Sequence, residues 1–423
     1  MSQDTVVRLR KKDEVVDPLT ELLREGAQRL ISQAVNAELA LFLEGHAGRL
    51  DEAGRRAVVR NGYLPEREVL TGIGPVKVEV PKVRDRLGAG TGFRSGLVPP
   101  YVRRARSVEA VLPWLYLKGV STGNMREALG ALLGEQARGL SAPVISRLKA
   151  GWTKEYEVWR RRLMGKERWV YLWADGIYSS LRAEETRCCL LVVIGVNERG
   201  QKRFLAIEDG VRESTESWHA VLSDLKRRGL KLAPKLAVGD GALGFWGALA
   251  EVFPETRQQR CWVHKSVNVL NYLPKAAQPK AKSMLHEIWM AETRAQAERA
   301  FECFLATYSA KYPKAAECLA KDRKSLLAFY DFPAEHWLHL RTTNPIESSF
   351  ATIRHRSDRT QGCVSRSTLL GLVFKLALSA EKGWHRLRGF ECLAEVVRGV
   401  KFVDGVRQEK QSQAKLQLPQ VAA

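Results

Sequence analysis

The sequence lacks the features that place a protein in a membrane or outside the cell. Its 423 residues contain no apolar stretch approaching the roughly 20 residues that a membrane-spanning helix needs. The N-terminus is charged and has no apolar core of a secretory signal. The 7 cysteines, two of them adjacent at Cys188 and Cys189, do not have the pattern of a disulfide framework. We therefore expect a reduced, cytoplasmic protein.

Negative charge is scarce relative to positive charge. The chain has 68 lysines and arginines against 47 acidic residues, a formal net charge of +21. This excess favours binding to a polyanion without specifying a fold. Any one basic cluster is equally well explained as a solvated helix face, but together they predict a long track for nucleic acid. The clusters lie at Arg8 to Lys12, Arg103 to Arg106, Arg160 to Arg162, Lys226 to Lys231 and Arg354 to Arg359.

The first region, residues 1–95, is predicted to hold one helix and a small hairpin and to contact DNA. Asp17 to Leu43 has apolar residues at helical spacing. Gly45 to Gly62 is polar and predicts a loop. Glu66 to Pro81 alternates apolar and polar residues around the turn Gly72 to Pro75, which predicts a hairpin.

Residues 96–165 are predicted to be helical and to contain a helix-turn-helix. Ser121 is a suitable N-cap for a helix over Asn124 to Leu133, and Gly134 to Leu140 reads as the connection. Ser141 can cap a second helix with Pro143 near its first position. The alternative is an ordinary helical hairpin, whereas the basic context favours a helix that enters the major groove. The residues expected to contact DNA from the second helix are Ser146, Arg147 and Lys149.

The period of the apolar residues changes at Arg168, where short apolar runs replace the helical pattern. Three predicted strands are followed by a helix, a strand, a helix and a strand. This order is that of a ribonuclease-H-like α/β domain, in which the acids of the first and fourth strands lie side by side. The predicted elements are Val170 to Trp173, Cys188 to Val196, Phe204 to Glu208, Trp218 to Leu225, Lys235 to Gly239, Ala242 to Val252 and Thr256 to Gln259.

The predicted catalytic domain is interrupted. Residues 166–264 form its first part, and residues 265–340 have no strand pattern and predict an all-α insertion. Residues 341–405 form the second part, with one long helical region through Ser367 to Arg388. Residues 406–423 are polar and predict a flexible tail.

Three acids stand at the edges of predicted elements: Asp175, Asp240 and Glu347. Each has a structural alternative, because Asp-Gly is an ordinary turn dipeptide and Glu347 can complete a capping box with Asn344. Their predicted convergence instead favours a site for hard divalent cations. Two Mg²⁺ ions, with Mn²⁺ as a substitute, would support in-line phosphoryl displacement with water or a 3′-hydroxyl as nucleophile.

Basic residues follow the third acid along the same predicted helix. Arg354 lies two turns after Glu347, with Arg356 and Arg359 nearby. These guanidinium groups could hold DNA phosphates beside the metal ions. A solvated basic helix remains the alternative.

Cys261 and His264 have a C-x2-H spacing that resembles half of a zinc site. No second pair with matching spacing follows nearby, and a structural zinc site needs four ligands. The sequence also argues against a zinc deaminase, because the H-x-E and C-x-x-C motifs that such an enzyme needs are absent. We therefore interpret His264 as a packing or hydrogen-bonding residue.

These motifs together resemble the mutator-type transposases of bacterial insertion sequences, within the group that uses an Asp-Asp-Glu triad. The resemblance extends over nearly the whole chain and in order. The matching stretches are RNGYLPEREV (60–69), YLKGVSTGNMREAL (116–129), YLWADGIY (171–178), LVVIGVNERG (191–200), AVGDGALGF (237–245), EVFPETRQQRCWVHK (251–265) and RTTNPIESSFATIRHR (341–356).

The resemblance implies roles for several residues. The triad falls on Asp175, Asp240 and Glu347, and the family's C-x2-H signature falls on Cys261 and His264. Its acid-plus-tryptophan stretch is matched by Glu213 and Trp218. The sequence departs from the family pattern at Ser348, Ser349 and Phe350, where many members have Arg-Leu-Asn, and at Gly239, where serine is common.

The resemblance also implies partners. Members bind the terminal inverted repeats of double-stranded DNA, cleave its 3′ ends and join them to target DNA, with a circular intermediate. Two ends must be paired, so a homodimer or higher oligomer is expected, in a bacterial cytoplasm and on the nucleoid when bound. Two other functions stay open at this point: a DNA-binding repressor with an inactive nuclease domain, and a metal nuclease such as a resolvase that cuts without joining.

Overall fold

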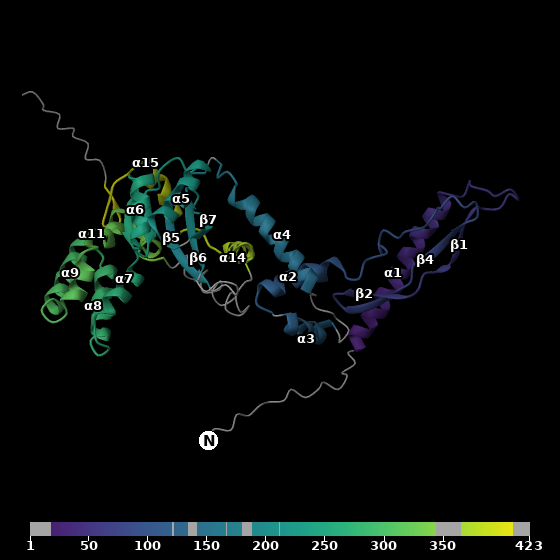
Figure 1. The fold of residues 1–423 in the computed structure, drawn as a ribbon, viewed down its shortest axis with the longest axis horizontal. Coiled ribbons are helices and arrows are strands. Elements are labelled where there is room, and N and C mark those ends of the chain that lie inside the picture. The colour runs from purple at the N-terminus through teal and green to yellow at the C-terminus, as the bar shows by residue number, and fades with distance from the viewer. Residues whose placement is uncertain are drawn as a thin grey trace, which may run out of the picture. The chain divides into compact units, whose positions relative to one another are not determined.

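The computed structural model describes residues 18–120, 122–133, 142–165, 167–179, 188–210, 212–343 and 365–408. The chain forms two compact units, Met1–Ser146 and Arg147–Ala423 (Figure 1). Each unit is described by itself. Within the described residues, no helix has both the length and the apolar character that crossing a bilayer requires.

The first unit is built on a long helix and two strand pairs. Helix α1 (Pro18–Glu44) and the hairpin of β2 (Arg67–Thr71) and β3 (Gly74–Val78) confirm the predicted helix and hairpin. Valines on α1, on this hairpin and beyond it form the core of the unit. The core valines are Val35, Val69, Val76, Val78, Val80 and Val98.

The predicted loop over residues 45–62 was wrong at its end. Residues Val58–Tyr63 form strand β1, which pairs antiparallel with β4 (Pro81–Asp85). Val59 pairs with Arg84, so the partner lies beyond the whole hairpin in sequence. A pairing between segments so far apart leaves no local signal in a polar, glycine-containing stretch.

Three helices complete the part of the chain before the large sheet. They are α2 (Arg106–Leu117), α3 (Thr122–Leu133) and α4 (Ala142–Arg160). Helices α3 and α4 lie where two helices were predicted. Residues 134–141, the predicted connection with its cap Ser141, lie outside the described residues, as does Ser121. The helix-turn-helix therefore stays a prediction.

The second unit contains a five-stranded mixed sheet, which confirms the α/β class. Its strands are β5 (Trp169–Ser179), β6 (Cys188–Asn197), β7 (Lys202–Gly210), β8 (Leu236–Gly239) and β9 (Arg257–Arg260). The order across the sheet is β7-β6-β5-β8-β9. The first three strands in sequence are antiparallel neighbours, and β8 and β9 run parallel to β5.

Two helices cover one face of this sheet. Helix α5 (Thr215–Arg227) and helix α6 (Leu243–Val252) pack on Leu172, Leu191 and Leu205 in one buried cluster (Figure 1). Helix α6 lies close to the segment before α5: a Cβ at Gly244 would be 2.3 Å from the Glu213 carbonyl oxygen. Glycine at this position thus allows the two segments to touch.

The segment between β9 and the predicted third acid is helical, as predicted, and contains no strand between residues 265 and 340. Its last turns are part of the core. Tyr171 Oη lies 2.8 Å from His336 Nδ1, and His336 Nε2 lies 2.8 Å from the Gly389 carbonyl oxygen. Burial lowers the pKa of His336, so the neutral ring donates from Nε2 and accepts at Nδ1. The helices are α7 (Trp262–Leu270), α8 (Gln278–Met290), α9 (Arg294–Tyr308), α10 (Pro313–Ala320), α11 (Arg323–Leu326) and α12 (Trp337–Leu340).

The C-terminal helix is shorter than predicted. Helix α14 (Arg366–Glu381) ends before Arg388, and the side chain of its last residue, Glu381, accepts a hydrogen bond from the Phe204 N–H at 3.0 Å. Trp384 then packs on Phe204, with 4.8 Å between ring centroids. Helix α15 (Leu393–Arg398) follows, and β10 (Phe402–Val403) pairs with β11 (Val406–Arg407), so the predicted tail begins with a short strand.

Candidate active site

Asp175 lies within a strand and not after its end. The first strand was predicted to end at Trp173, but β5 continues to Ser179 because β6 is long enough to pair with it throughout. Asp175 is opposite Val192 of β6 and is only 8% exposed. Pairing with β6 therefore fixes the backbone that carries this carboxylate.

Asp240 is the neighbour of Asp175 across the sheet. In the parallel ladder of β5 and β8, Ala174 is opposite Gly239, the last residue of β8. The residue that follows each of them in the chain is an aspartate, Asp175 or Asp240. The Gly176 N–H donates to Asp175 Oδ1 at 2.8 Å, and the Ala242 N–H donates to Asp240 Oδ1 at 2.9 Å. The described residues donate no hydrogen bond to the second oxygen of either acid, which leaves both oxygens for another ligand.

The charges at this place repel one another. Burial, together with the charges of Asp240 and Glu213, raises the pKa of Asp175 to about 7, against the opposing effect of His264 and the Gly176 N–H. Burial and then Asp240 also raise the pKa of Glu213. A cation bound between the carboxylates would relieve this repulsion, so the carboxylate pair suits a divalent metal ion.

Glu213 reaches the acids from the loop before α5. A Cβ built at Gly176 would lie 2.4 Å from Glu213 Oε1, so the carboxylate lies directly on the strand that carries Asp175. The Tyr178 hydroxyl lowers the pKa of Glu213, against the larger effect of burial. Trp218 is buried on α5 and meets Phe245 edge-on at 5.1 Å, which holds α5 against α6.

The guanidinium of Arg260 lies against Gly241, the residue that follows Asp240. Gly241 has a φ of 88°, and a Cβ there would fall 0.4 Å from Nη1 of Arg260. The guanidinium of Arg260 is held from its other side by Asp322, 3.5 Å from Nε. Glycine at 241 thus provides both the turn after Asp240 and the space for a fixed positive charge.

Cys261 and His264 hold the end of the helical insertion. The Thr343 N–H and hydroxyl both donate to Cys261 Sγ at 3.4 Å, and His264 Nδ1 lies 3.4 Å from the same hydroxyl. Burial alone would raise the pKa of Cys261, but hydrogen bonds from His264 and Thr343 outweigh it, and the pKa is lowered. The Trp262 N–H also donates to the Arg341 carbonyl oxygen at 2.9 Å. Both ends of the insertion are therefore bonded to each other.

Residues 2–386 match the family described as Transposase, Mutator family. The chain belongs to this family. It is 55% identical over 282 residues to the transposase for insertion sequence element IST2 of Acidithiobacillus ferrooxidans, an alignment covering 67% of this chain and 95% of that protein. It is 48% identical over 295 residues to the transposase for IS6120 of Mycolicibacterium smegmatis, covering 70% and 91%.

A similarity in structure is much weaker. The Drosophila P element transposase strand transfer complex aligns with a TM-score of 0.26 and 9% identity, over 71% of this chain and 89% of that chain. A TM-score this low carries no information about the fold of this chain.

The predicted third acid and the basic residues after it are not in the described part of the chain. Glu347, Arg354, Arg356 and Arg359 lie within residues 344–364. Thr343 is the last residue described before them, and four residues of extended chain span at most about 14 Å. Among the described residues, no three His, Cys, Asp or Glu side chains gather as ligands for a metal ion.

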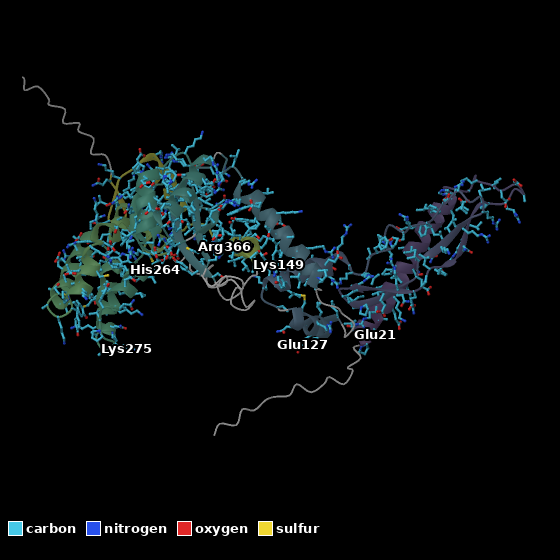
Figure 2. The ribbon with its side chains drawn as sticks, in the orientation of Figure 1. Glu21, Glu127, Lys149, His264, Lys275 and Arg366 are labelled. Carbon is cyan, nitrogen blue, oxygen red and sulfur yellow. The ribbon has the colours of Figure 1, made fainter. Side chains whose placement is uncertain are left out.

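The residues predicted to contact DNA lie on α4. Ser146 and Arg147 are exposed, and Lys149 is partly buried (Figure 2). Helix α4 also packs on the sheet, because Tyr156 Oη donates to the Ile207 carbonyl oxygen at 2.7 Å.

Sequence reasoning missed Arg260 at this site. Its only signal is its position directly before Cys261, and nothing in the sequence shows that its side chain crosses to the turn at Gly241. Glu213 was indicated only through the family resemblance.

Proposed function

We propose that this chain is the DNA transposase of an insertion sequence. It binds the terminal inverted repeats, cleaves the 3′ ends and transfers them to target DNA, using Asp175, Asp240 and Glu347. The observation that carries the proposal is the parallel register of β5 and β8, which makes Asp175 and Asp240 neighbours at a buried, like-charged site. Membership of the Mutator family supports it.

The sheet order supports a ribonuclease-H-like catalytic domain. Three antiparallel strands come first in sequence, and the fourth and fifth strands add in parallel on the free side of the first. This arrangement puts the first and fourth strands next to each other. The two aspartates belong to these two strands, as the proposed mechanism requires.

The residues present fit magnesium. The free oxygens of Asp175 and Asp240, together with a carboxylate oxygen of Glu347, would hold it, since Mg²⁺ prefers oxygen ligands. When bound, two such ions would supply activation of the attacking oxygen and stabilisation of the leaving oxygen.

The other residues position these acids. The strand pairing of β5 fixes Asp175, and Arg260 holds the turn that follows Asp240. His264 and Cys261 hold Thr343, from which the chain leads to Glu347. We infer that this fixed starting point limits where the Glu347 carboxylate can lie.

One site can serve both chemical steps. In cleavage, the oxygen of water bonds to phosphorus as the bond to the 3′ oxygen of the element breaks, which releases a 3′-hydroxyl. In joining, that hydroxyl oxygen bonds to a target phosphorus as a target P–O bond breaks. Both are in-line displacements at phosphorus. Arg354, Arg356 and Arg359 would hold the phosphates, and Ser146, Arg147 and Lys149 the inverted repeats, in a dimer or higher oligomer that pairs both ends.

Replacing Asp240 by asparagine tests the proposal. We expect strand transfer to fall by about 1,000-fold or more, because a metal-binding oxygen is lost. The measurement is joining of a labelled inverted-repeat end to plasmid DNA in Mg²⁺. Glu251→Gln is the matched control, since it removes an exposed carboxylate of the same unit. Joining by the Asp240 variant at the rate of the control would refute the triad.

DNA binding without any Mg²⁺-dependent product from the wild type would favour a repressor, and cleavage without joining would favour a nuclease.

Gly176→Ala is expected to slow cleavage without removing any acid. The new methyl group would displace the Glu213 carboxylate, while the backbone of Gly176, whose φ is not positive, accepts alanine. We expect cleavage to slow about tenfold, the size of a modest positioning effect, with little change in melting temperature. Single-turnover cleavage measures the effect. Gly151→Ala is the control, because no atom lies within 4 Å of its added Cβ. Equal rates for the two variants would show that the position of Glu213 does not matter.

A further inference from the structure

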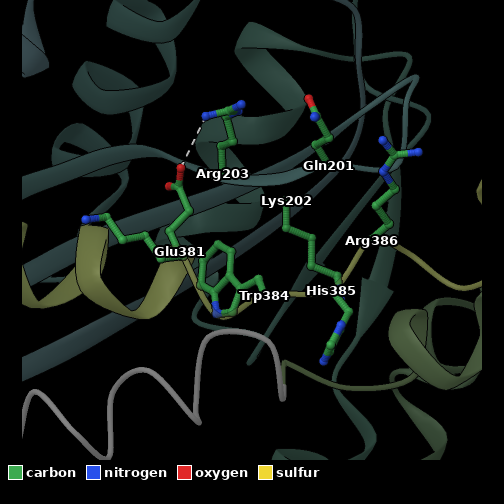
Figure 3. Close-up of a pocket in the computed structure, with 8 residues that line it drawn as sticks. Gln201, Lys202, Arg203, Glu381, Trp384, His385 and Arg386 are labelled. Atoms are coloured by element: carbon green, nitrogen blue, oxygen red, sulfur yellow. Dashed lines mark hydrogen bonds and ion pairs between the residues drawn. The ribbon is translucent and has the colours of Figure 1, made fainter.

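A pocket that the proposed mechanism does not use lies at the edge of the sheet. Its volume is about 360 Å³, at the lower end of the range for small-ligand sites. It is formed by the residues that begin β7 and by the turn that follows α14 (Figure 3). The lining side chains are Gln201, Lys202, Arg203, Glu381, Lys382, Trp384, His385 and Arg386.

The pocket carries excess positive charge. Its one carboxylate, Glu381, is already engaged by Arg203 at 3.4 Å and by the Phe204 N–H at 3.0 Å. In the described part of the chain, Lys202, Lys382 and Arg386 have no carboxylate within 4.0 Å. Burial lowers the pKa of Lys202, with no acid opposing this effect. Arg386 lies over the Phe390 ring, 5.2 Å from its centroid, but an anion in the pocket would meet three cations that no carboxylate of the described residues neutralises.

An aromatic side chain stands among these cations. Trp384 is partly buried and its ring is backed by Phe204, with 4.8 Å between the ring centroids. This support fixes the indole in one place. A supported aromatic ring beside cations is the combination on which proteins stack the bases of single-stranded nucleic acid.

The pocket is separate from the acids but on the same sheet. Lys202 pairs with Val196 of β6, and Val196 pairs in turn with Tyr171 of β5. Tyr171 lies four residues before Asp175 on the same strand. Four residues along a strand and two strand spacings place the two sites on the order of 15 Å apart. This is about four to five nucleotides along a B-form strand.

We propose that this pocket binds one nucleotide of a single-stranded DNA segment, with its phosphate between Lys202, Lys382 and Arg386 and its base against Trp384. The inference rests on DNA being the substrate, as proposed above. It adds a second contact that holds an unpaired strand a few nucleotides from the reacting phosphate.

The test is DNA binding by the full chain in EDTA, measured by fluorescence anisotropy. The probes are a labelled 30-base-pair duplex with a ten-nucleotide single-stranded 3′ tail, and the same duplex with blunt ends. Lys382→Gln with Arg386→Gln removes two exposed cations. We expect about tenfold weaker binding of the tailed DNA, a salt dependence smaller by about 1 to 2 in slope, and a much smaller change for blunt DNA.

The control is Lys280→Gln with Lys314→Gln, which removes the same charge from exposed positions on the helical insertion. Trp384→Leu keeps all charges and is expected to weaken tailed binding about tenfold through lost stacking. Unchanged melting temperatures would show that the variants fold. Equal losses for both charge variants, or equal losses on tailed and blunt DNA, would overturn the proposal. Because no Mg²⁺ is present, these outcomes do not depend on the acids; failure of the wild type to bind either DNA would overturn the proposed function as well.

Discussion

Replacing Asp175 by asparagine is expected to raise the melting temperature of the magnesium-free protein at pH 8. The folded protein raises the pKa of Asp175 from its ordinary 3.8 to about 7. At pH 8 the folded state must keep a buried negative charge beside Asp240 and Glu213, whereas the unfolded chain exposes it to water. This difference lowers the free energy of unfolding by about 4 kcal/mol. Asparagine resembles the neutral carboxyl group, and its Oδ1 can still accept from the Gly176 N–H.

The effect has a definite pH dependence. Below pH 3.8 both states bind the proton, and the stability that the protonated group contributes is fully present. Between about pH 4 and 7 the unfolded chain loses its proton while the folded protein keeps it, so wild-type stability falls as pH rises through this window. The variant lacks this group, and its advantage should more than double between pH 5 and pH 8, where it should reach roughly 5 to 10 °C.

Thermal unfolding in EDTA from pH 5 to pH 8 measures this difference. Adding Mg²⁺ at pH 8 should raise the melting temperature of the wild type, because an ion bound only by the folded state stabilises it. It should not raise that of the variant. An advantage of the variant that is the same at pH 5 and pH 8 would show that Asp175 does not titrate as described.

Replacing Asp322 by alanine is expected to destabilise the second unit by about 3 to 5 kcal/mol. Lys265 is fully buried, and its Nζ lies 2.5 Å from Asp322 Oδ2. Without the carboxylate, a buried ammonium group is left uncompensated, which is among the most costly single changes in a protein interior. Asp322 also holds Arg260, so the guanidinium behind Asp240 is released and strand transfer should slow as well.

Urea unfolding measures the loss. The double variant Lys265→Met with Asp322→Ala separates the two causes, since it removes the buried ammonium together with its partner. The double variant should recover a substantial part of the lost stability but not the lost activity, because Arg260 remains unheld. A double variant less stable than Asp322→Ala would show that the buried charge is not the source of the cost.

Apolar runs predicted the strands of the sheet, because a strand buried on both faces needs apolar residues at nearly every position. All ten residues of β6 are buried, and its predicted bounds differ by one residue. The same rule stopped the first predicted strand at Trp173, since Asp175 and Gly176 are not apolar. Their place in β5 depends on pairing with β6, and β1 likewise depends on a distant partner.

The candidate site could be predicted only in part from the sequence. Asp175 and Asp240 follow apolar runs that predict neighbouring strands, and the register places them side by side. Arg260 and Thr343 act through side chains that cross between elements, and no spacing in the sequence encodes such a crossing. Glu347, with the arginines that follow it, remains a prediction because residues 344–364 lie outside the described residues.

Hydrogen bonds close the helical insertion at its base, so a change in the length of the insertion has little effect on the sheet. The chain leaves the sheet at Trp262 and returns at Arg341, and these two residues are hydrogen-bonded. The entropy of closing a loop grows only with the logarithm of its length, so doubling the excursion costs only about 0.6 kcal/mol. Helices α8, α9 and α10 lie between the two points. Residues gained or lost in their connections are expected to leave the acids in place, so length differences among relatives should concentrate in these outer helices.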